Sequence, residues 1–311
     1  MTSKNVTTTS RIDHPVNPYY QNKMLDTLDP LLIYAMFGQS VAMPQHEGDT
    51  VKWRRYAKKS AATTPLSEAQ DPSPVQSSKT DISAQVREYG SYEQISSWLK
   101  FTGLSSDQDA IVDRLKAQMA LTIDTLCRDV VIGGASGATC SNGTPVTTYL
   151  NKTDVDTAVR TLLTEDASMI TPKLKAGTGQ GTSPIRDAFI ALASNSLITD
   201  IENISGFKHV ASYAQGDAAY AGEWGSTGNV RWILSSNGYK SGSNYTVSIL
   251  AKDAYGNVQI SGGQGPLIYT PADRTGSPLQ RYSTIGWLRN YVARILNEVL
   301  VYNLVCTSVN G

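Results

Sequence analysis

Residues 51–59 read Val-Lys-Trp-Arg-Arg-Tyr-Ala-Lys-Lys, a run that is typical of an extended strand. The residues that follow, 60–78, are rich in Pro, Ser, Thr and Gln, and a second strand-like arm covers residues 79–92. Two arms around a long low-complexity tip predict an extended β-hairpin. At about 3.3 Å per residue, each arm would reach roughly 30 Å.

Neither arm of the predicted hairpin has a continuous apolar face, and an isolated two-stranded hairpin is marginally stable in water. Such an arm is expected to lie on a neighbouring subunit, with Trp53 and Tyr56 as interface anchors. The candidate inter-subunit contact residues are Trp53, Arg54, Arg55, Tyr56, Lys58, Lys59, Glu68, Tyr89 and Trp98.

The basic side chains of the first arm have two interpretations. Strand alternation would place Lys52, Arg54 and Lys58 on one face and Arg55 and Lys59 on the other. We favour a solvated or partner-facing arm that pairs with acidic residues of another copy. A grip on nucleic acid is the alternative for this cluster.

The composition of the chain suits turn-rich β-structure. Its 311 residues could form one large domain or two or three smaller ones. The 27 basic and 27 acidic residues balance, so capture of nucleic acid by overall charge is not expected. Charged residues make up only 17% and hydrophobic residues 40%, which favours broad polar contact surfaces and excludes disorder.

No motif for targeting, catalysis or a cofactor is visible. The N-terminus has no apolar core typical of a signal peptide, and no apolar run reaches the roughly 18 residues of a membrane span. No HExxH, CxxC or GxSxG sequence occurs, and the glycine clusters at 133–137 and 177–181 lack the context of a phosphate loop. His14, His46 and His209 are scattered without metal-ligand spacing. We therefore expect no enzyme, no cofactor and no metal.

The three cysteines, Cys127, Cys140 and Cys306, lie far apart in the sequence and are odd in number. A disulfide framework is therefore not expected, and buried or inert thiols are the favoured interpretation. The same reasoning indicates synthesis in a reducing cytoplasm.

Outside the hairpin, the sequence predicts a mixture of helices and strands. Residues 1–30 are polar and broken by prolines, as expected of a terminal arm. Apolar residues at helical spacing predict one long amphipathic helix over 107–131, about 37 Å in length. The later elements expected are a helix from Thr153, a buried strand at 189–193, a short helix at 196–204, strands at 231–235, 244–250 and 264–269, and a helix followed by a buried strand within 286–305.

Short phrases along the chain resemble one family of proteins. They are Phe37-Gly-Gln39, Gly48-Asp-Thr-Val-Lys-Trp53, Pro65-Leu-Ser-Glu68, Tyr89-Gly90, Gly222-Glu-Trp-Gly225, Ala254-Tyr-Gly256, Gly276-Ser-Pro-Leu279 and Thr284-Ile-Gly-Trp287. In order and spacing, from about residue 25 to 307, these phrases resemble the major capsid proteins of tailed phages, in the subgroup of N-four-like podophage coat proteins.

The resemblance implies an α+β chain with the Hong Kong 97-type capsid fold. The parts it implies are an N-terminal arm and lead-in at 1–47, an extended hairpin loop at 48–99, a peripheral domain at 100–184 with the spine helix 107–131, a mainly axial domain at 185–279, and a closing peripheral segment at 280–311. The tip at 60–78 departs from the family pattern, and covalent Lys–Asn crosslinking is not expected.

The resemblance also implies a function. Copies of the chain would assemble as hexamers and pentamers into the icosahedral head of a double-stranded DNA phage, in the host bacterial cytoplasm, and remain in the virion capsid. The further partners implied are a portal protein, a scaffolding component, a decoration protein and packaged DNA through non-specific contact, without a membrane. A secreted or surface β-rich adhesin or carbohydrate-binding module is the alternative, which the missing signal peptide and the long helix argue against.

Overall fold

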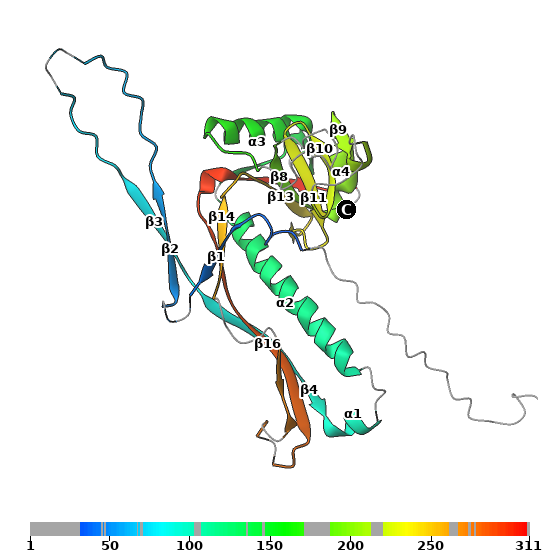
Figure 1. The fold of residues 1–311 in the computed structure, drawn as a ribbon. Helices are drawn as coiled ribbons and strands as arrows, with labels where there is room; N and C mark the ends of the chain where they lie inside the picture. Colours follow the sequence, from blue (N-terminus) through cyan, green and yellow to red (C-terminus); the bar gives the residue numbers. More distant parts are fainter. Residues whose placement is uncertain are drawn as a thin grey trace, which may run out of the picture.

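The computed structural model describes residues 32–309, apart from 45, 47, 67, 69–70, 103–106, 135, 145–146, 171–186, 213–219, 261–266, 273–274 and 277. The expected terminal arm at 1–30 lies outside the described residues. The described chain forms a body around an eight-stranded sheet, a long extension from that body, and a hairpin that points the other way (Figure 1).

The eight-stranded sheet is the centre of the body. Its strands are β5 (Gly137–Thr139), β8 (Phe189–Ser194), β9 (Phe207–His209), β10 (Glu223–Thr227), β11 (Val230–Ser235), β12 (Lys240–Ser241), β13 (Asn244–Leu250) and β17 (Val301–Thr307). They follow the order β5-β17-β13-β8-β11-β10-β9, with β12 beside β13. Strands β8 and β11 are buried at every position because both faces of the sheet centre are covered.

Two helices, α3 (Lys152–Thr164) and α4 (Ile198–Glu202), pack against this sheet. Asn151 begins α3, because its side chain accepts a hydrogen bond from the backbone N–H of Asp154 at 2.8 Å. Leu162 of α3 and Ile201 of α4 share one buried cluster with Trp232 of the sheet. This cluster is the main core of the body.

A five-stranded sheet runs from the body into the extension. Its strands are β1 (Gln39–Met43), β4 (Arg87–Ser96), β14 (Tyr255–Ile260), β15 (Ile268–Thr270) and β16 (Tyr282–Ile295). The 14-residue β16 joins the two regions, because its first part pairs with β4 and β15 and its last part pairs with β14. The short helix α1 (Ser97–Thr102) follows β4 at the far end of the extension (Figure 1).

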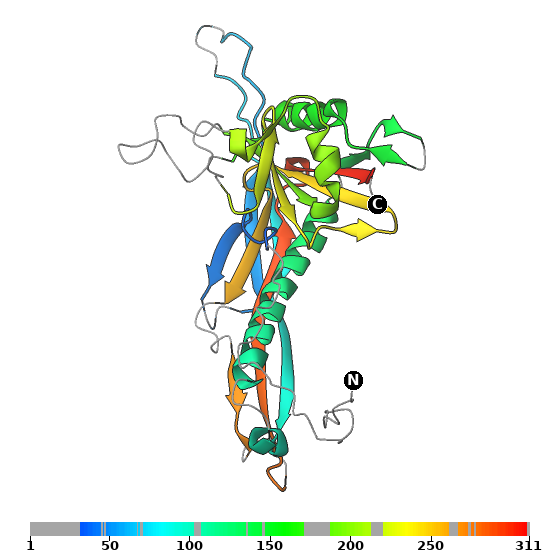
Figure 2. The same ribbon diagram turned by 90° about the vertical axis from the view of Figure 1, so that its right-hand side faces the viewer.

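The long helix α2 (Asp107–Ile132) lies along this five-stranded sheet from the end of the extension to the body (Figure 2). In its first half, Leu115 packs with Trp287 of β16. In its last turns, Cys127 and Val131 share a buried cluster with Tyr255 of β14. The apolar stripe of α2 therefore ties the extension to the body.

Smaller elements complete the described chain. They are β2 (Thr50–Tyr56) and β3 (Lys79–Gln85), which form the long hairpin, β6 (Asn142–Gly143) and β7 (Thr148–Tyr149), which form a small lateral hairpin, and three short 3-10 helices, η1 (Asn195–Leu197), η2 (Val210–Ser212) and η4 (Glu298–Leu300). The lateral hairpin projects from the body beside the eight-stranded sheet (Figure 2).

Most of the predicted elements are present. The helix predicted over 107–131 is α2, which ends one residue later, at Ile132. The others that are confirmed are the helix from Thr153 (α3), the strands at 189–193 (β8), 231–235 (β11) and 244–250 (β13), and the short helix at 196–204, which is η1 followed by α4. Only part of the strand expected at 264–269 falls on described residues, as β15.

The prediction of a helix near the start of 286–305 is wrong. Residues 282–295 form the strand β16, and the buried strand that was expected after it is β17. Burial alternates along β16, because α2 covers only one of its faces: the residues buried at alternate positions are Ser283, Ile285, Trp287, Tyr291 and Ala293. The residue types do not follow this alternation, since the buried Ser283 is polar and the more exposed Leu288 and Val292 are apolar, so the sequence lacks the alternating pattern typical of a strand.

The two sheets cut across the domain ranges expected from the sequence. The helix α3 falls within 100–184 but packs on the eight-stranded sheet, and β17 falls within 280–311 but pairs with β13 of that same sheet. Strands β14 and β15, which fall within 185–279, pair with β16 of the other sheet. Pairing between distant strands sets these groups, and no local pattern records it.

Candidate assembly surfaces

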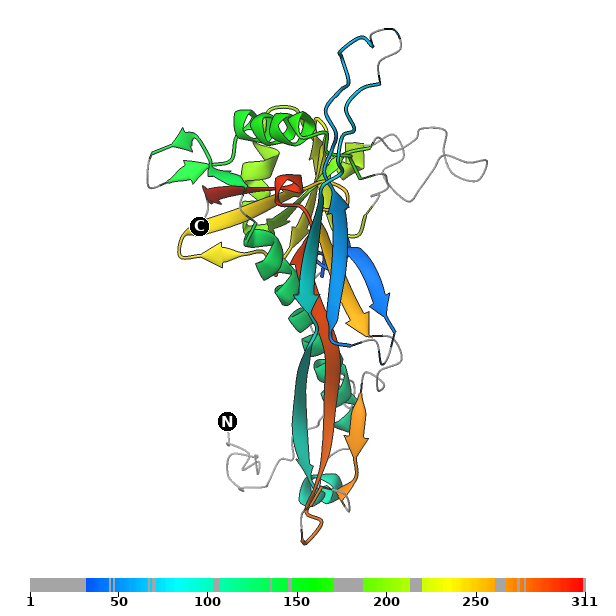
Figure 3. The same ribbon diagram turned by 90° about the vertical axis from the view of Figure 1, so that its left-hand side faces the viewer.

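The hairpin of β2 and β3 is the first surface available to another copy. Its ladder ends at the pair Tyr56 and Lys79, followed by one backbone hydrogen bond from the Ala57 N–H to the Ser78 carbonyl at 3.1 Å. The loop beyond is exposed at every described position and projects past the body (Figure 3). The first arm is thus shorter than the predicted 51–59, because cross-strand pairing stops where the Pro- and Ser-rich tip begins.

The second arm also differs from the prediction. It leaves the hairpin at Gln85 and continues from Arg87 as β4, which pairs with β16 over ten positions. The segment from 87 to 96 is therefore part of the chain's own sheet rather than a free arm. Only residues 50–85 form the hairpin proper.

Trp53, an expected anchor for another copy, faces its own chain. A Cβ placed on Gly256 of β14 would lie 3.0 Å from Cζ2 of Trp53, so the indole ring lies against the bare backbone of that strand. The indole N–H is buried and has no hydrogen-bond partner within the described chain. Trp53 therefore fixes the base of the hairpin onto β14.

Two carboxylates stabilise the hairpin on the strands themselves. Arg54 donates a hydrogen bond to Asp81 on the opposite strand at 3.1 Å, and this bond lowers the pKa of the Asp81 carboxyl. At the other end of the ladder, Gln85 donates to Asp49 at 2.6 Å and lowers the pKa of that carboxyl. Both pairs are exposed to solvent, so they select the register more than they add to stability.

Two further basic residues connect the hairpin to the body. Arg55 donates a hydrogen bond to Asn297, and Lys58 forms an ion pair with Asp166 in the turn after α3. The side chains of Lys58 and Asp166 are 77% and 67% exposed, so water screens this pair strongly. The hairpin is therefore anchored firmly at Trp53 and only weakly further out.

The remaining candidate residues do not gather at one place. Tyr56 is 65% exposed, and Lys59 and Glu68 lie in the exposed loop. Tyr89 of β4 packs against two buried clusters, the one that contains Tyr255 and the one that contains Trp287. Trp98 in α1 is 72% exposed at the far end of the extension. Their role in contacts between copies stays a prediction.

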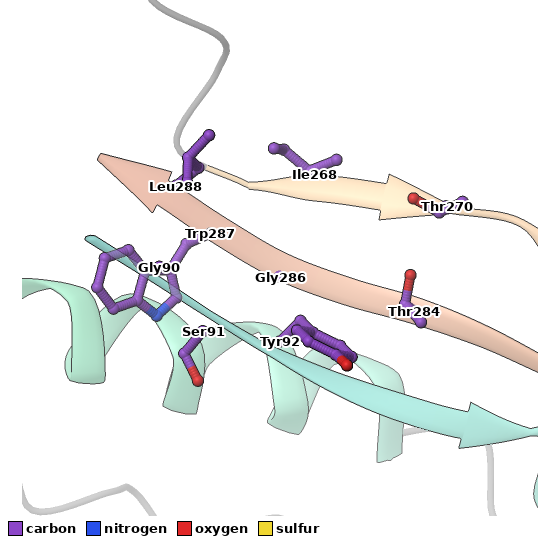
Figure 4. A pocket seen from close by; sticks show the side chains of 9 residues that line it. All are labelled: Gly90, Ser91, Tyr92, Ile268, Thr270, Thr284, Gly286, Trp287 and Leu288. Carbon is purple, nitrogen blue, oxygen red and sulfur yellow. The ribbon is translucent and has the colours of Figure 1, made fainter. Parts of the chain in front are cut away.

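A second surface, which the sequence did not indicate, lies on the extension. We call it the distal face, and its residues are Gly90, Tyr92, Ile268, Thr270, Thr284, Gly286 and Leu288. They line a hollow of about 430 Å³ on the side of β4, β16 and β15 that faces away from α2, while Trp287 points toward the helix (Figure 4).

The shape of this hollow follows from two glycines. Gly286 lies opposite Tyr92, and a Cβ at Gly286 would lie 2.6 Å from the Cβ of Tyr92. Gly90 lies opposite Leu288, and a Cβ there would lie 2.8 Å from the Trp287 carbonyl oxygen. The sheet surface is thus bare at its centre and rimmed by exposed Tyr92 and Leu288. The register between β4 and β16 creates it, so no local sequence pattern could have found it.

The histidines and acidic residues give no sign of a metal site in the described part of the chain. Within the described ranges, no group of three or more His, Cys, Asp and Glu side chains could hold a metal ion. His46 follows β1 and His209 ends β9, whereas His14 lies outside the described residues. In the part of the chain that the structure describes, no helix combines the length and hydrophobicity that a membrane span requires.

Of the comparisons with known proteins, only the one with solved structures finds similar chains. No family model and no curated protein matches the chain. Among solved structures, the capsid asymmetric unit of cyanophage Pam1 matches with a TM-score of 0.65 and 13% identity, over 100% of both chains. The capsid of Ralstonia phage GP4 matches with a TM-score of 0.63 and 10% identity, over 96% of this chain and 98% of that one.

The capsid structure of cyanophage P-SCSP1u gives a third match, with a TM-score of 0.62 and 10% identity, over 100% of this chain and 97% of that chain. Each of these similarities extends over nearly the whole chain, including the extension and the hairpin. The chain therefore has the mixed α and β fold of phage capsid subunits.

Proposed function

We propose that this chain is the major capsid protein of a double-stranded DNA tailed phage and that its copies close into the icosahedral head that encloses the genome. The observation that carries this proposal is the match to phage capsid subunits over at least 96% of the chain. Such a match includes parts that a monomer does not need for its own core, namely the exposed hairpin loop and the long extension.

In the terms of the Hong Kong 97-type fold, we assign the five-stranded sheet and α2 to the peripheral domain. The eight-stranded sheet with α3 and α4 is assigned to the axial domain, and the β2–β3 hairpin to the extended loop. This assignment moves α3 and β17 to the axial part and β14 and β15 to the peripheral part, because strand pairing and shared cores group them so. Residues 1–47 are the proposed N-terminal arm and lead-in.

The proposed mechanism is mechanical. Heterologous contacts, in which one patch of a subunit meets a different patch of the next, generate closed rings, here hexamers and pentamers. Stable contacts of this kind bury about 1,200 Å² or more. The hairpin loop has no apolar cover of its own, since Leu66 and Val75 are 70% and 73% exposed. Burial of such side chains against a neighbouring copy would stabilise the ring.

The same proposal places the chain in the virion capsid after assembly in the bacterial cytoplasm. It has a structural role and is not an enzyme. Its proposed partners beyond other copies are a portal protein, a scaffolding component, a decoration protein and the packaged DNA, which it contacts without sequence specificity. The balanced charge of the chain supports weak contact with DNA rather than tight binding.

The test compares the purified full chain with a variant in which residues 60–78 are deleted. Assembly is followed by size-exclusion chromatography and negative-stain microscopy, and folding of the dissociated subunit by denaturant unfolding. We expect shells or rings from the full chain, and loss of these assemblies in the variant with a nearly unchanged unfolding midpoint. Every described residue of the deleted segment is exposed, which is why folding should survive.

A variant with residues 60–78 in scrambled order is the matched control, because it keeps length and composition. If this variant assembles like the full chain, the length and composition of the loop are sufficient for assembly and the order of its residues does not matter. A full chain that stays monomeric at every concentration would overturn the proposed function. Equal loss of folding and assembly on deletion would contradict the role of the hairpin.

A further inference from the structure

Two of the three cysteines, distant in the sequence, meet at one edge of the eight-stranded sheet. Strand β5 pairs with β17 in parallel, with Thr139 opposite Val305. The backbone N–H of Cys140 continues this ladder with a 2.9 Å hydrogen bond to the Val305 carbonyl. The next two residues in register are therefore Cys140 and Cys306.

The two thiols also share one environment. Cys140 is 3% exposed and Cys306 is fully buried, and both belong to the core between the sheet and α3. Neighbouring strands lie about 4.8 Å apart, and paired residues point to the same face. A disulfide spans Cα separations of about 4.4–6.8 Å, so the register places this pair within reach. Both cysteines are free in the structure.

We propose that Cys140 and Cys306 form a disulfide when the subunit meets an oxidised small-molecule disulfide, and that this bond fastens the edge strand β5 to β17. The thiolate of Cys140 attacks the small disulfide and releases one small thiolate, leaving a mixed disulfide. The Cys306 thiolate then attacks the sulfur of Cys140 and releases the second. The two protons from the cysteines end on the two released thiols, and the small disulfide is reduced by two electrons.

The accessibility of each thiol to the small disulfide determines which cysteine reacts first. The hydrogen bond with Cys306, followed by burial, raises the pKa of Cys140 far above its usual value, so the reactive thiolate is scarce in the closed structure. Strand β5, however, is a three-residue edge strand with exposed side chains, and exposed Ser141 follows Cys140. Local opening of this edge exposes Cys140 first. The reaction is therefore slow and depends on opening of β5.

The bond would close a covalent loop from residue 140 to residue 306. Such a loop restricts the unfolded chain and raises the stability of the folded one. The lateral hairpin of β6 and β7 begins two residues after Cys140, so its base would also be fixed to the sheet. None of this chemistry depends on the proposed function, since it needs only the folded subunit.

The experiment uses the full chain, purified with a reductant and then incubated natively with oxidised or with reduced glutathione. After denaturation, free thiols are counted by maleimide labelling and mass spectrometry, and digestion without reductant identifies linked peptides. With oxidised glutathione we expect the three thiols of the sequence to fall to one, at Cys127, with one linked peptide pair containing Cys140 and Cys306. The denaturant midpoint of the oxidised subunit should also rise.

Two variants serve as controls. Cys127→Ser should lose both remaining thiols as the unaltered chain does, because Cys127 contacts the Tyr291 hydroxyl and not another cysteine. Cys306→Ser should show no internal link and no rise in the midpoint. Three thiols that persist in the unaltered chain, glutathione adducts without a link, or links only between different copies would each overturn the proposal.

Discussion

The carboxylate of Asp124, in α2, accepts a 2.7 Å hydrogen bond from the backbone N–H of Tyr34, 90 residues earlier in the chain. The same oxygen accepts a 3.3 Å bond from the Ala35 N–H, and the second oxygen accepts a 2.8 Å bond from the Asn237 side chain. Asp124 is 1% exposed. One buried side chain thus joins the segment before β1, the long helix and the loop after β11.

Replacing this carboxylate should destabilise the subunit strongly. Asp124→Ala would leave the N–H groups of Tyr34 and Ala35 without this acceptor, and the Asn237 amide would keep only its 3.3 Å bond to the Thr125 hydroxyl. Each unsatisfied buried donor costs about 1–3 kcal/mol. We expect a loss of about 3 kcal/mol in the free energy of unfolding, measured in urea.

Asp113→Ala is the matched control on the same helix, because Asp113 is exposed and only pairs with Lys116 one turn away. Its expected cost is below about 0.5 kcal/mol. A similar loss of unfolding free energy in the two variants would show that the buried Asp124 contributes no more to stability than an exposed carboxylate.

The same carboxylate predicts a pH dependence. Burial raises the pKa of Asp124 above its usual value, and burial acts in the same direction on the pKa of Asp200. As the pH rises above about 4, the unfolded chain loses these protons before the folded chain does. The folded state then binds more protons, so this contribution to stability is present at low pH and is lost as the pH rises through the raised pKa.

Urea unfolding of the full chain and of Asp124→Asn between about pH 4 and pH 7 tests this sign. The Asn side chain does not titrate, so the stability of the variant relative to the unaltered chain should increase as the pH rises. Other carboxylates cancel in this difference. Parallel stability profiles for the two proteins would contradict a raised pKa at Asp124.

The Asp124 contacts show where sequence reasoning stops. The periodicity of residues 107–131 predicted α2 almost to the residue, because helical spacing is a local signal. The same pattern could not tell that Asp124 is buried, since its partners Tyr34 and Asn237 lie about a hundred residues away on either side. A polar residue on the stripe becomes informative only when its partners are known.

The candidate site shows the same limit. The hairpin was predicted from its two arms and polar tip, and the pairing of β2 with β3 confirms it. The direction of its side chains was not predictable, because Trp53 faces β14 only through the long-range placement of Gly256. Likewise, Cys140 and Cys306 are neighbours only through the pairing of β5 with β17.

The buried ion pair of the eight-stranded sheet gives a second stability prediction. Arg231 donates to Glu223 at 3.0 Å, and their side chains are 8% and 0% exposed. Glu223→Ala would leave a buried guanidinium without its carboxylate, which costs about 3–5 kcal/mol. The expected result is a large drop in the unfolding midpoint of the subunit.

The exposed pair Lys152–Asp156 on α3 provides the comparison, with side chains 44% and 58% exposed. Asp156→Ala should cost less than about 0.5 kcal/mol, because water already screens the pair. Should Glu223→Ala prove as mild as Asp156→Ala, the buried pair would contribute no more than a surface one.

Two of the predicted contact residues, Trp53 and Trp98, should separate folding from assembly. Trp53 lies against Gly256 and fixes the hairpin to its own chain, so Trp53→Ala should lower the unfolding free energy by about 2 kcal/mol. Trp98 is 72% exposed on α1, so Trp98→Ala should change that free energy by less than about 0.5 kcal/mol.

Under the proposed function, Trp98→Ala should instead reduce the yield of shells or rings, because large exposed aromatic side chains are common anchors of contacts between proteins. Unfolding of dissociated subunits and negative-stain counts at equal concentration measure the two effects. If Trp98→Ala assembles normally, Trp98 is not a contact residue between copies. If the unfolding midpoint of Trp53→Ala is unchanged, the indole ring of Trp53 does not hold the base of the hairpin.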